Sequence, residues 1–496
     1  MASKNEQTQI DIQESINKIK VLLIYPPKIG GVKTPFYRIG ADTDDDGAGH
    51  KAPIGLLYVA TAVKKYSKHE IRVIDCSAEN KSIEETVKEA ESFQPDLVGI
   101  SAWTNYWYSA YTIGKSLKAK MPHIHLTYGG PHIGIYIKET LSIPFVDSVI
   151  AGDGEFPFTH LCNMVANNDF MNNIHGLHLK QYGPKEGSEA FSILNNLDLV
   201  PIPDRSFIKE ELYTSVVAHD NNVATMISSR GCPFACIFCK LHFQKTVCRS
   251  AENVVEELKQ LNNLGFKEID IYDDTFTWSK ERVINICEGI IKEGIDIEWA
   301  IRDRVTNADK DLLLLMRKAG LKRVHYGVES GVDAILKRIN KKITTDETRR
   351  AVKIAKEAGL QVMTFFMIGL IDESYEDMKK TIEFALELKS DYSTFNITVP
   401  WPGTQLYKQA LASGIIPYDY WLQYAIEPTN DFVIYRFIEN KVDLRTMIKL
   451  QTSAIRRFYF KPSYLLKEVS KVQSSAEFIR KAKVGLSLLR GHILNR

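Results

Sequence analysis

Three cysteines, Cys232, Cys236 and Cys239, lie at spacings of four and three residues, directly after an apolar run that predicts a strand. Four thiolates close a tetrahedral metal site, whereas three leave one coordination position open. An iron–sulfur cluster held by three cysteines therefore keeps one iron accessible to a substrate or cofactor. The spacing favours such an open iron–sulfur centre at this loop.

A structural zinc site is the alternative interpretation, because Cys248 follows nine residues after Cys239. Together the four thiols could form a closed zinc knuckle. Cys248 taken alone is more typical of a small buried apolar residue than of a metal ligand. The spacing favours the open cluster over zinc.

Six strand–helix units follow one another in the middle of the chain. The predicted strands are Ala224–Ser228, Glu268–Tyr272, Ile297–Ile301, Arg323–Gly327, Val362–Ile368 and Thr394–Val399. The predicted helices between them are Ala251–Leu264, Lys280–Glu293, Lys310–Ala319, Thr345–Ala358 and Tyr375–Leu388. This alternation predicts an incomplete parallel barrel, with its active site at the carboxyl ends of the strands.

Polar residues recur at those carboxyl ends. The set comprises Asp273, Asp274, Arg302, Arg304, Glu329, Ser330, Gly369, Asp372, Glu373 and the stretch from Asn396 to Thr404. Paired carboxylates there could hold an ammonium group or a ribose diol through charge-assisted hydrogen bonds. Helix N-capping by Asp274, Ser330 and Glu373 is the alternative, and capping can coexist with ligand binding. Their recurrence at several strand ends favours ligand binding for the group.

The amino-terminal third alternates in the same way. Its predicted strands are Lys20–Tyr25, Ile71–Asp75, Leu97–Ser101, His125–Tyr128 and Val146–Ala151, and its predicted helices begin near Pro53, Ser82 and Tyr111. The pattern predicts a doubly wound parallel sheet that binds its ligand at the carboxyl ends of the strands. The candidate ligand-binding residues there are Ser101, Thr104, Gly129, Gly130, His132, Gly152, Gly154 and Glu155. Glycine allows a bulky ligand to approach the backbone closely, although any doubly wound sheet has glycine turns.

The composition is that of an ordinary globular protein, with 44% hydrophobic and 25% charged residues in a chain of 496. A length of this kind predicts two or three domains. A net charge of +2 argues against a nucleic-acid partner. Seven cysteines, three of them clustered, indicate a reducing compartment and not a disulfide scaffold. The polar first 17 residues lack the apolar core of a signal peptide, and no run has the ~20 apolar residues of a spanning helix. We therefore predict a cytoplasmic protein.

The quoted residues resemble those of the radical S-adenosylmethionine (SAM) superfamily, and more narrowly its cobalamin-binding branch, also called class B. The resemblance extends over roughly Lys20 to Tyr407. Its marks in the middle of the chain are the Cys232-x3-Cys236-x2-Cys239 loop with Phe238, Asp273-Asp274-Thr275-Phe276, Gly327-Val328-Glu329-Ser330-Gly331 and Pro400-x-Pro402-Gly403-Thr404-x-Leu406-Tyr407. Upstream, Pro53-Ile54-Gly55-Leu56, Gly129-Gly130-Pro131-His132 and Gly152-Asp153-Gly154-Glu155 match the cobalamin domain.

The resemblance implies three cofactors: a 4Fe-4S cluster, SAM and cobalamin. Cys232, Cys236 and Cys239 would bind three irons, and the amino and carboxylate groups of SAM would chelate the fourth. Asp273 and Asp274 occupy the positions where the family contacts the SAM amino group, and Glu329 and Ser330 those where it contacts the ribose or methionyl part. The stretch from Gly369 to Glu373 departs from the family pattern, because Ile371 and Asp372 replace a Pro-Gly pair.

In the amino-terminal domain, the resemblance implies that Ser101 to Thr104, Gly129 to Gly134 and Gly152 to Glu155 cradle cobalamin. The Asp-x-His-x-x-Gly signature that supplies a histidine to cobalt is absent, because Gly130 and not aspartate stands two residues before His132. We therefore predict cobalt without a protein histidine ligand.

The predicted domains are a disordered leader (1–17), a Rossmann-like cobalamin-binding domain with its linker (18–195), a partial (β/α)6 radical SAM barrel (206–412) and a small helical accessory region (413–496). The chain from Gln451 to Arg496 carries ten Lys or Arg residues against Glu468 and Glu477. The stretch from Ala476 to Leu489 has helical apolar spacing with basic residues opposite. Such a helix could lie on an anionic membrane, but packing on the barrel with a solvated basic face is the favoured interpretation.

The predicted function is C-methylation of an unactivated carbon. The resemblance implies that an electron from the cluster cleaves SAM to a 5′-deoxyadenosyl radical, and that cobalamin delivers the methyl group. One alternative uses the same cofactors for cyclisation, ring contraction or oxidation. The other is a non-catalytic cobalamin sensor or carrier with a zinc knuckle. The expected partners are a small-molecule or lipid substrate and an electron donor such as flavodoxin or ferredoxin. Peripheral membrane contact would involve the basic carboxyl-terminal helix.

Overall fold

The computed structural model describes residues 12, 17–28, 50–215, 223–240, 245–432, 441–470, 472, 478–479 and 481–482. They form two compact units. The first holds the described parts of Met1–Pro35, His50–Tyr213 and Asp419–Ile434, and the second those of Phe36–Gly49, Thr214–Tyr418 and Tyr435–Arg496. Each unit has a sheet of its own, and the domain boundaries given above remain predictions.

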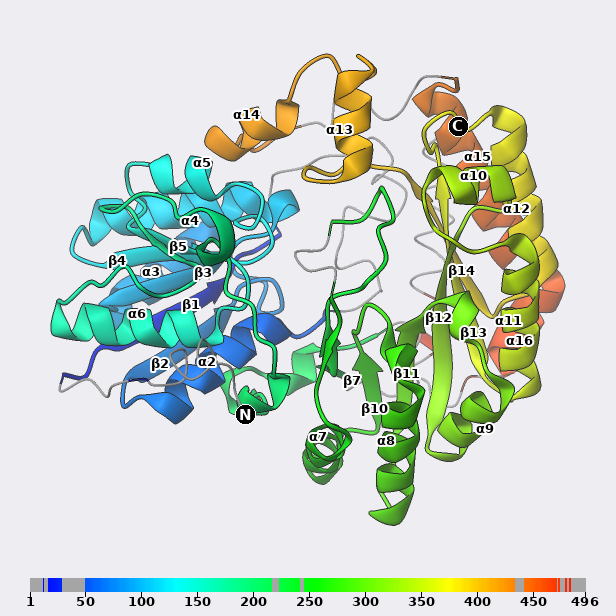
Figure 1. The fold of residues 1–496 in the computed structure, drawn as a ribbon, viewed down its shortest axis with the longest axis horizontal. Coiled ribbons are helices and arrows are strands. Elements are labelled where there is room, and N and C mark those ends of the chain that lie inside the picture. The colour runs from blue at the N-terminus through cyan, green and yellow to red at the C-terminus, as the bar shows by residue number, and fades with distance from the viewer. Residues whose placement is uncertain are drawn as a thin grey trace. The chain divides into compact units, whose positions relative to one another are not determined.

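The first unit is built on a six-stranded sheet in the order β2-β1-β3-β4-β5-β6 (Figure 1). The strands are β1 (Lys20–Tyr25), β2 (Glu70–Asp75), β3 (Leu97–Ser101), β4 (His125–Gly129), β5 (Ser148–Ile150) and β6 (Leu177–Leu179). Strands β1 to β5 pair in parallel, and β6 pairs antiparallel to β5 at the edge. The connecting helices are α2 (Ile54–Tyr66), α3 (Ile83–Phe93), α4 (Trp107–Lys120), α5 (Ile137–Ser142) and α6 (Glu155–Asn167). The predicted doubly wound sheet is confirmed.

Local signals in the sequence account for several of these helices. Pro53 stands at the N-cap of α2, where its missing N–H costs nothing. Ser82 and Glu85 form a capping box at the start of α3. Helix α6 was not foreseen, because every residue from Glu155 to Met164 is buried. A helix buried all round has no amphipathic period for a sequence pattern to detect.

A short segment from beyond the barrel packs within the first unit. Helix α14 (Tyr420–Ile426) is held by the indole Nε1–H of Trp107, which donates to the carbonyl of Ala425 at 3.0 Å. The hydroxyl of Tyr424 accepts from the backbone N–H of Tyr108 at 3.2 Å. The sequence predicted only a small accessory helical region here, and the packing of α14 against α4 was not foreseen.

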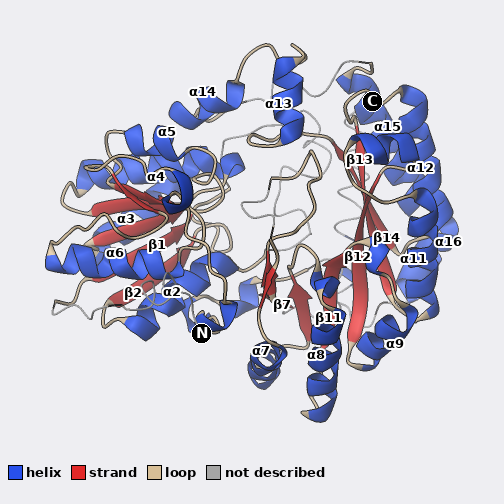
Figure 2. Cartoon of the chain, viewed as in Figure 1, coloured by secondary structure: helices blue, strands red, loops and turns tan. Residues whose placement is uncertain are grey.

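The second unit is an open parallel sheet in the order β14-β13-β12-β11-β10-β7. Its strands are β7 (Val223–Met226), β10 (Glu268–Ile271), β11 (Glu298–Asp303), β12 (Leu321–Glu329), β13 (Gln361–Ile368) and β14 (Tyr392–Ile397). A separate antiparallel pair consists of β8 (Ser229–Arg230) and β9 (Val247–Cys248). Figure 2 shows the sheet curving with its helices on the outer face. This is the predicted partial barrel of six parallel strands.

The helices of the second unit whose ranges were predicted agree with the prediction to within a few residues: α7 (Ala251–Asn263), α8 (Lys280–Lys292), α9 (Lys310–Lys318), α11 (Thr345–Glu357) and α12 (Tyr375–Leu388). The unit also contains α10 (Asp333–Arg338), α13 (Gln405–Ala412), α15 (Leu444–Tyr459) and α16 (Pro462–Ser470), and no ranges were predicted for the last three. Short 3₁₀ turns occur at Thr104–Tyr106, Gly187–Glu189, Leu197–Leu199, Arg205–Phe207, Glu210–Leu212, Phe276–Trp278 and Val305–Asn307. Helix α10 was not predicted.

The carboxyl-terminal stretch lies mostly beyond what the structure describes. Of the predicted basic helix from Ala476 to Leu489, only residues 478–479 and 481–482 are described. Helix α16 before it exposes Leu465, Leu466 and Val469. No described helix combines the length and the apolar character that crossing a bilayer requires.

Substituting Gly152 by alanine tests how closely the turn after β5 packs against the backbone of Ser192. Gly152 has φ +91°, and a Cβ there would lie 2.2 Å from the carbonyl oxygen of Ser192. We expect Gly152→Ala to lower the free energy of unfolding of this unit by about 2–5 kcal/mol, from backbone strain plus overpacking. Urea unfolding followed by circular dichroism measures the loss.

Gly183→Ala is the matched control for that substitution. Gly183 also has a positive φ, +77°, but a Cβ there meets nothing within 4 Å. We expect a loss of only about 1–2 kcal/mol, which is the strain contribution alone. Equal effects of the two substitutions would contradict a packing role for Gly152.

Candidate functional site

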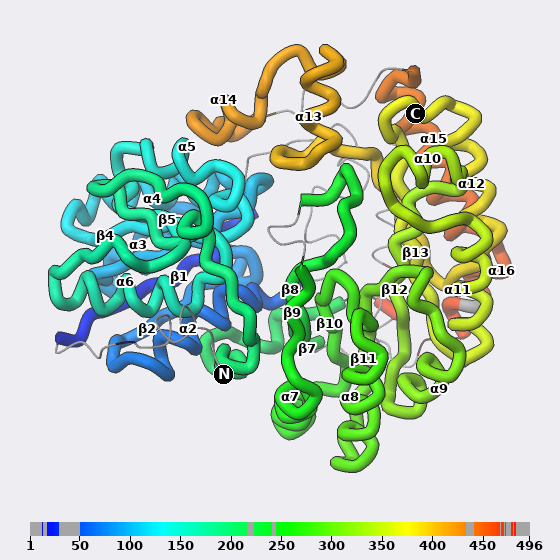
Figure 3. The backbone as a smooth tube through the Cα atoms, in the orientation of Figure 1, coloured from blue at the N-terminus to red at the C-terminus, as the bar shows by residue number. Residues whose placement is uncertain are grey.

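The cysteine loop leaves β8 and returns at β9 (Figure 3), and contacts from other parts of the second unit hold it. The N–H of Ile237 donates to the carbonyl of Ile339 at 3.1 Å, and the carbonyl of Ile237 accepts from the N–H of Leu406 at 2.8 Å. The side-chain amide of Asn340 donates to the carbonyl of Ala235 at 2.7 Å. The loop is therefore fixed by the segments that follow β12 and β14.

The three thiols of the loop belong to one environment. Cys232 and Cys236 are partly buried, Cys239 is exposed, and none forms a disulfide. The pKa of the Cys239 thiol is raised to about 12, first by the desolvation that surrounding protein atoms impose and then by Asp274, Cys236 and Cys232. Cys248 has different charged neighbours: burial raises the pKa of its thiol, Arg282 opposes the rise and Asp273 adds to it.

Asp273 and Asp274 differ in what they contact. Asp273 is fully buried, and its carboxylate accepts from the N–H of Ser228 at 2.7 Å and from the hydroxyls of Ser228 at 2.5 Å and Ser229 at 2.7 Å. These bonds fix the turn between β7 and β8 that begins the cysteine loop. The Asp274 side chain reaches the surface instead. Its pKa is raised by desolvation and by Asp273, and the N–H of Gly231 opposes the rise.

Glu329 ends β12 in an ion pair. Its Oε1 lies 2.8 Å from Nζ of Lys341, and both side chains are almost buried. Glu329 has φ +68°, a conformation that costs a non-glycine residue of order 1–3 kcal/mol. The neighbouring Ser330 is fully buried, and its hydroxyl meets that of Thr381 at 3.1 Å. Ser330 thus serves the local turn, whereas Glu329 stands beside a cation.

At the end of β13, a buried glutamate holds the turn that contains Gly369. Oε2 of Glu373 accepts from the N–H groups of Gly369 at 2.8 Å and Leu370 at 3.0 Å. Burial raises the pKa of Glu373 to about 7, against the effect of those two donors. Gly369 has φ +83°, and a Cβ there would lie 2.6 Å from Sδ of Met447 in α15. The left-handed backbone conformation favours glycine here, and the close approach of the Met447 side chain adds to that preference.

In the first unit, the glycine turns at the carboxyl ends of β4 and β5 serve the fold itself. A Cβ on Gly130, whose φ is +100°, would lie 2.9 Å from the carbonyl oxygen of Ala102. Gly152 is similarly crowded by Ser192. Gly129 and Gly154 are less confined, since their nearest contacts would be 3.8 Å and 3.3 Å. Close approach of neighbouring backbone, and not only of a ligand, explains the first two glycines.

His132 lies in a buried aromatic stack. Its ring is 4.3 Å from that of Trp107 and nearly parallel to it, and Nδ1 meets the hydroxyl of Thr104 at 3.2 Å. Burial lowers the pKa of His132 to about 3, so the imidazole is neutral at physiological pH. Ser101 stands at the end of β3, and Glu155 at the start of α6. By contrast, the indole of Trp103 is 43% exposed, in the loop after β3.

Two family models match the chain, one for each unit. The model of the radical SAM superfamily matches residues 226–385, and the model of the B12 binding domain matches residues 48–162. An uncharacterized methyltransferase of Pyrococcus horikoshii is 33% identical over 457 residues, which cover 91% of this chain and 95% of that protein. The chain belongs to the cobalamin-binding branch of the radical SAM superfamily.

Two further proteins illustrate the range of this branch. The anaerobic magnesium-protoporphyrin IX monomethyl ester cyclase of Rubrivivax gelatinosus is 27% identical over 430 residues, 84% of this chain and 75% of that enzyme. The structure of the cobalamin-dependent SAM radical enzyme OxsB, with aqua-cobalamin and SAM bound, matches with a TM-score of 0.70 at 15% identity. That match covers 95% of this chain and 72% of OxsB, and it confirms the fold.

The donor set of the radical SAM unit suits a 4Fe-4S cluster. Three thiols without disulfides lie on one anchored loop, and thiolate sulfur is the ligand such clusters use. Among the described residues, no three His, Cys, Asp or Glu side chains converge on a single metal ion. A cluster distributes its thiolates over separate irons, so it does not require such convergence.

The B12-binding unit suits cobalamin bound at the carboxyl end of its sheet. The exposed indole of Trp103 offers an apolar surface to a planar ring. His132 is buried in its aromatic stack and is not presented at the surface. That no protein histidine binds cobalt stays a prediction.

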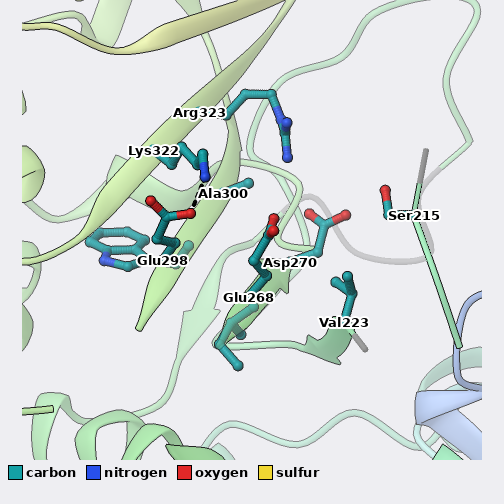
Figure 4. A pocket seen from close by; sticks show the side chains of 10 residues that line it. Ser215, Val223, Glu268, Asp270, Glu298, Ala300, Lys322 and Arg323 are labelled. Atoms are coloured by element: carbon teal, nitrogen blue, oxygen red, sulfur yellow. Dashed lines mark hydrogen bonds and ion pairs between the residues drawn. The ribbon is translucent and has the colours of Figure 1, made fainter. Parts of the chain in front are cut away.

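The barrel also has a pocket at its opposite end (Figure 4). Its volume is about 270 Å³, including space open to solvent, and it is lined by the first residues of β7, β10, β11 and β12. Glu298 and Lys322 pair at its wall. Because the cysteine loop follows the carboxyl ends of the strands, this pocket lies away from the cluster ligands, and the radical SAM site is not there.

Sequence reasoning missed several residues around the cysteine loop. Lys341 and Asn340 belong to no motif that was singled out, although both contact the loop or its neighbours. Arg304 was expected near a strand end, but its position 4.0 Å from Sγ of Cys236 was not foreseen. A lysine that follows a helix carries no local signal for a partner twelve residues earlier in the chain.

Replacing Cys232 by alanine tests the cluster assignment. We expect Cys232→Ala to lose most bound iron and acid-labile sulfide after anaerobic reconstitution, because two thiolates hold the cluster poorly. Cys248→Ala is the control and should retain full iron, since Cys248 lies near Arg282 and Asp273. Metal and sulfide analysis of both variants decides the matter. Zinc in place of iron, or equal loss in the two variants, would contradict the assignment.

Proposed function

We propose that this chain is a cobalamin-dependent radical SAM C-methyltransferase that acts on an unactivated carbon. The observation that carries the proposal is an anchored loop of three free thiols at the carboxyl edge of a radical SAM barrel, in one chain with a B12-binding sheet. The methyltransferase name of the Pyrococcus relative, which matches nearly end to end, supports methyl transfer.

The cofactors would supply the difficult chemistry when bound: the cluster and SAM a 5′-deoxyadenosyl radical, and cobalamin the methyl group. The residues of the chain bind and orient. Cys232, Cys236 and Cys239 hold the cluster, and Asp274 accepts a hydrogen bond from the SAM amino group. Asp273 positions the start of the cysteine loop through its bonds to Ser228 and Ser229.

Further SAM contacts are assigned to the strand ends after β12 and β13. Glu329 orients the ribose or methionyl part of SAM. The ammonium group of Lys341 holds the Glu329 carboxylate in place. Ser330 fixes the turn beside Glu329 through Thr381. Gly369 presents its turn to the adenine with Glu373 behind it.

Cobalamin binding is assigned to the loops after β3, β4 and β5. Ser101 and Thr104 belong to the first loop, Gly129, Gly130 and His132 to the second, and Gly152, Gly154 and Glu155 to the third. His132 supports the cradle from within through Trp107 and Thr104 and does not bind cobalt.

The partners complete the proposal. The substrate is a small molecule or a lipid, and a flavodoxin or ferredoxin supplies the electron. Exposed Leu465, Leu466 and Val469 on α16 support peripheral contact with a membrane near the basic carboxyl-terminal stretch.

The second candidate function uses the same cofactors without methyl transfer, as in a radical cyclisation. It is favoured by the similarity to a cyclase over 84% of this chain. Both candidates require the same cluster and SAM contacts, so they differ only in the fate of the substrate radical.

The nucleoside products separate the two functions. The reaction contains SAM, a low-potential reductant, cobalamin and a substrate that the enzyme consumes. We expect 5′-deoxyadenosine and S-adenosylhomocysteine in about equal amounts, because one SAM provides the radical and a second SAM provides the methyl group. Mass spectrometry of an anaerobic reaction measures both. Substrate consumption with 5′-deoxyadenosine alone would replace methyl transfer by the second function.

Substitutions of the two neighbouring aspartates test their division of roles. We expect Asp274→Asn to weaken SAM binding about 10- to 100-fold, the effect of losing one hydrogen bond to a charged group, with the unfolding midpoint unchanged. Calorimetric titration of reconstituted enzyme with SAM measures it. Asp273→Asn, the comparison variant, should instead lower the unfolding midpoint, because it weakens three buried bonds. SAM binding of normal strength by Asp274→Asn would refute the assigned contact.

A further inference from the structure

The guanidinium of Arg304 lies against the cysteine loop. Only 5% of the residue is exposed, and the guanidinium carbon is 3.7 Å from the ring centre of Phe234. Nη1 is 4.0 Å from Sγ of Cys236, and Nη2 donates to the carbonyl of Lys341. The side chain therefore bridges the loop that bears the thiols and the segment that anchors this loop.

The charge of Arg304 is balanced differently from that of three other cations of the barrel. Arg249 pairs with Glu257, Arg302 with Asp270 and Lys341 with Glu329. Within the described residues, Arg304 forms no ion pair with a carboxylate, and its Nε lacks a hydrogen-bond partner. The adjacent Asp303 accepts from the backbone N–H of Arg304 at 2.8 Å, from Asn307 at 3.0 Å and from Thr277.

A buried cation without a counter-charge is strongly unfavourable, because desolvation of the ion is uncompensated. The group that faces Arg304 is the thiol of Cys236, which becomes a thiolate when it binds iron. A cluster with three thiolates is an anion, and its presence supplies the missing charge.

We propose that Arg304 is the counter-cation of the iron–sulfur cluster and raises the cluster's reduction potential through Cys236. Reduction adds one electron to the cluster and makes or breaks no bond. A fixed positive charge and an N–H donor directed at a ligand sulfur stabilise the more negative, reduced state. Arg304 is a positioning and tuning residue in this role. The inference rests on the cluster of the proposed function, and it is independent of methyl transfer.

The test is an anaerobic redox titration of the reconstituted protein with dithionite, without SAM or cobalamin, with the reduced cluster measured by electron paramagnetic resonance. For Arg304→Gln, we expect the ratio of reduced to oxidised cluster at a fixed potential to fall at least tenfold. That change corresponds to a midpoint 59 mV more negative for one electron. Arg304→Lys retains the charge and should remain within threefold of the wild type.

Arg302→Gln is the matched control, because Arg302 lies two residues before Arg304, within β11, and its charge is already balanced by Asp270. It should change the ratio less than threefold. A ratio within threefold of the wild type in Arg304→Gln, at full iron content, would overturn the proposal. Normal potential with weakened SAM binding in Arg304→Gln would assign the guanidinium to the SAM carboxylate instead.

Iron content and thermal unfolding of each variant accompany the titration. If Arg304→Gln assembles no cluster, Arg304→Lys decides the test. Full iron content and a near-normal reduction midpoint of the cluster in Arg304→Lys support the role of Arg304 as counter-cation. Loss of the cluster in Arg304→Lys as well refutes a role based on charge.

Discussion

The placement of the cluster ligands depends on one constraint, which is that the cysteine loop has no helix or strand of its own over its described residues 231–240 and 245–246. Within the loop, the N–H of Cys239 donates to the carbonyl of Cys236 at 3.1 Å. Other N–H and C=O groups of the loop must be satisfied by other segments if the loop is to keep one shape. Ile339 and Asn340 do so after β12, and Leu406 does so after β14. These segments meet because the six-stranded sheet curves. The curvature of the barrel is therefore what positions the thiols, and the loop sequence alone could not.

Charges at the strand ends are organised in the same way. Two buried carboxylates accept hydrogen bonds that fix turns: Asp273 from Ser228 and Ser229, and Glu373 from Gly369 and Leu370. Such contacts fix the backbone before any ligand arrives, which reduces the ordering cost of binding. The exposed Asp274 then extends from a turn that is already rigid.

The sequence was sufficient to predict most of the fold and part of the site. Parallel strands buried on both faces read as apolar runs, and β1 and β3 were predicted with their observed bounds. The spacing of Cys232, Cys236 and Cys239 is sufficient to predict them as cluster ligands. Helix α14 could not be predicted to join the first unit, because its bond to Trp107 spans more than three hundred residues and seven-residue helices leave weak patterns. The contacts of Arg304 and Lys341 could not be predicted for the same reason, because each residue meets its partners only in the folded barrel.

A motif at a strand end thus marks two kinds of residue that sequence alone does not separate. Contacts within the fold occupy the backbone of Gly130 and the side chains of Asp273 and Ser330. The side chains of Asp274 and Trp103 are exposed. Both kinds are needed, because a presented side chain binds well only when its backbone is held in advance. Replacing a residue of the first kind should damage binding through the fold, and replacing one of the second kind should damage binding alone. The family pattern combines the two, and only the contacts of each side chain separate them.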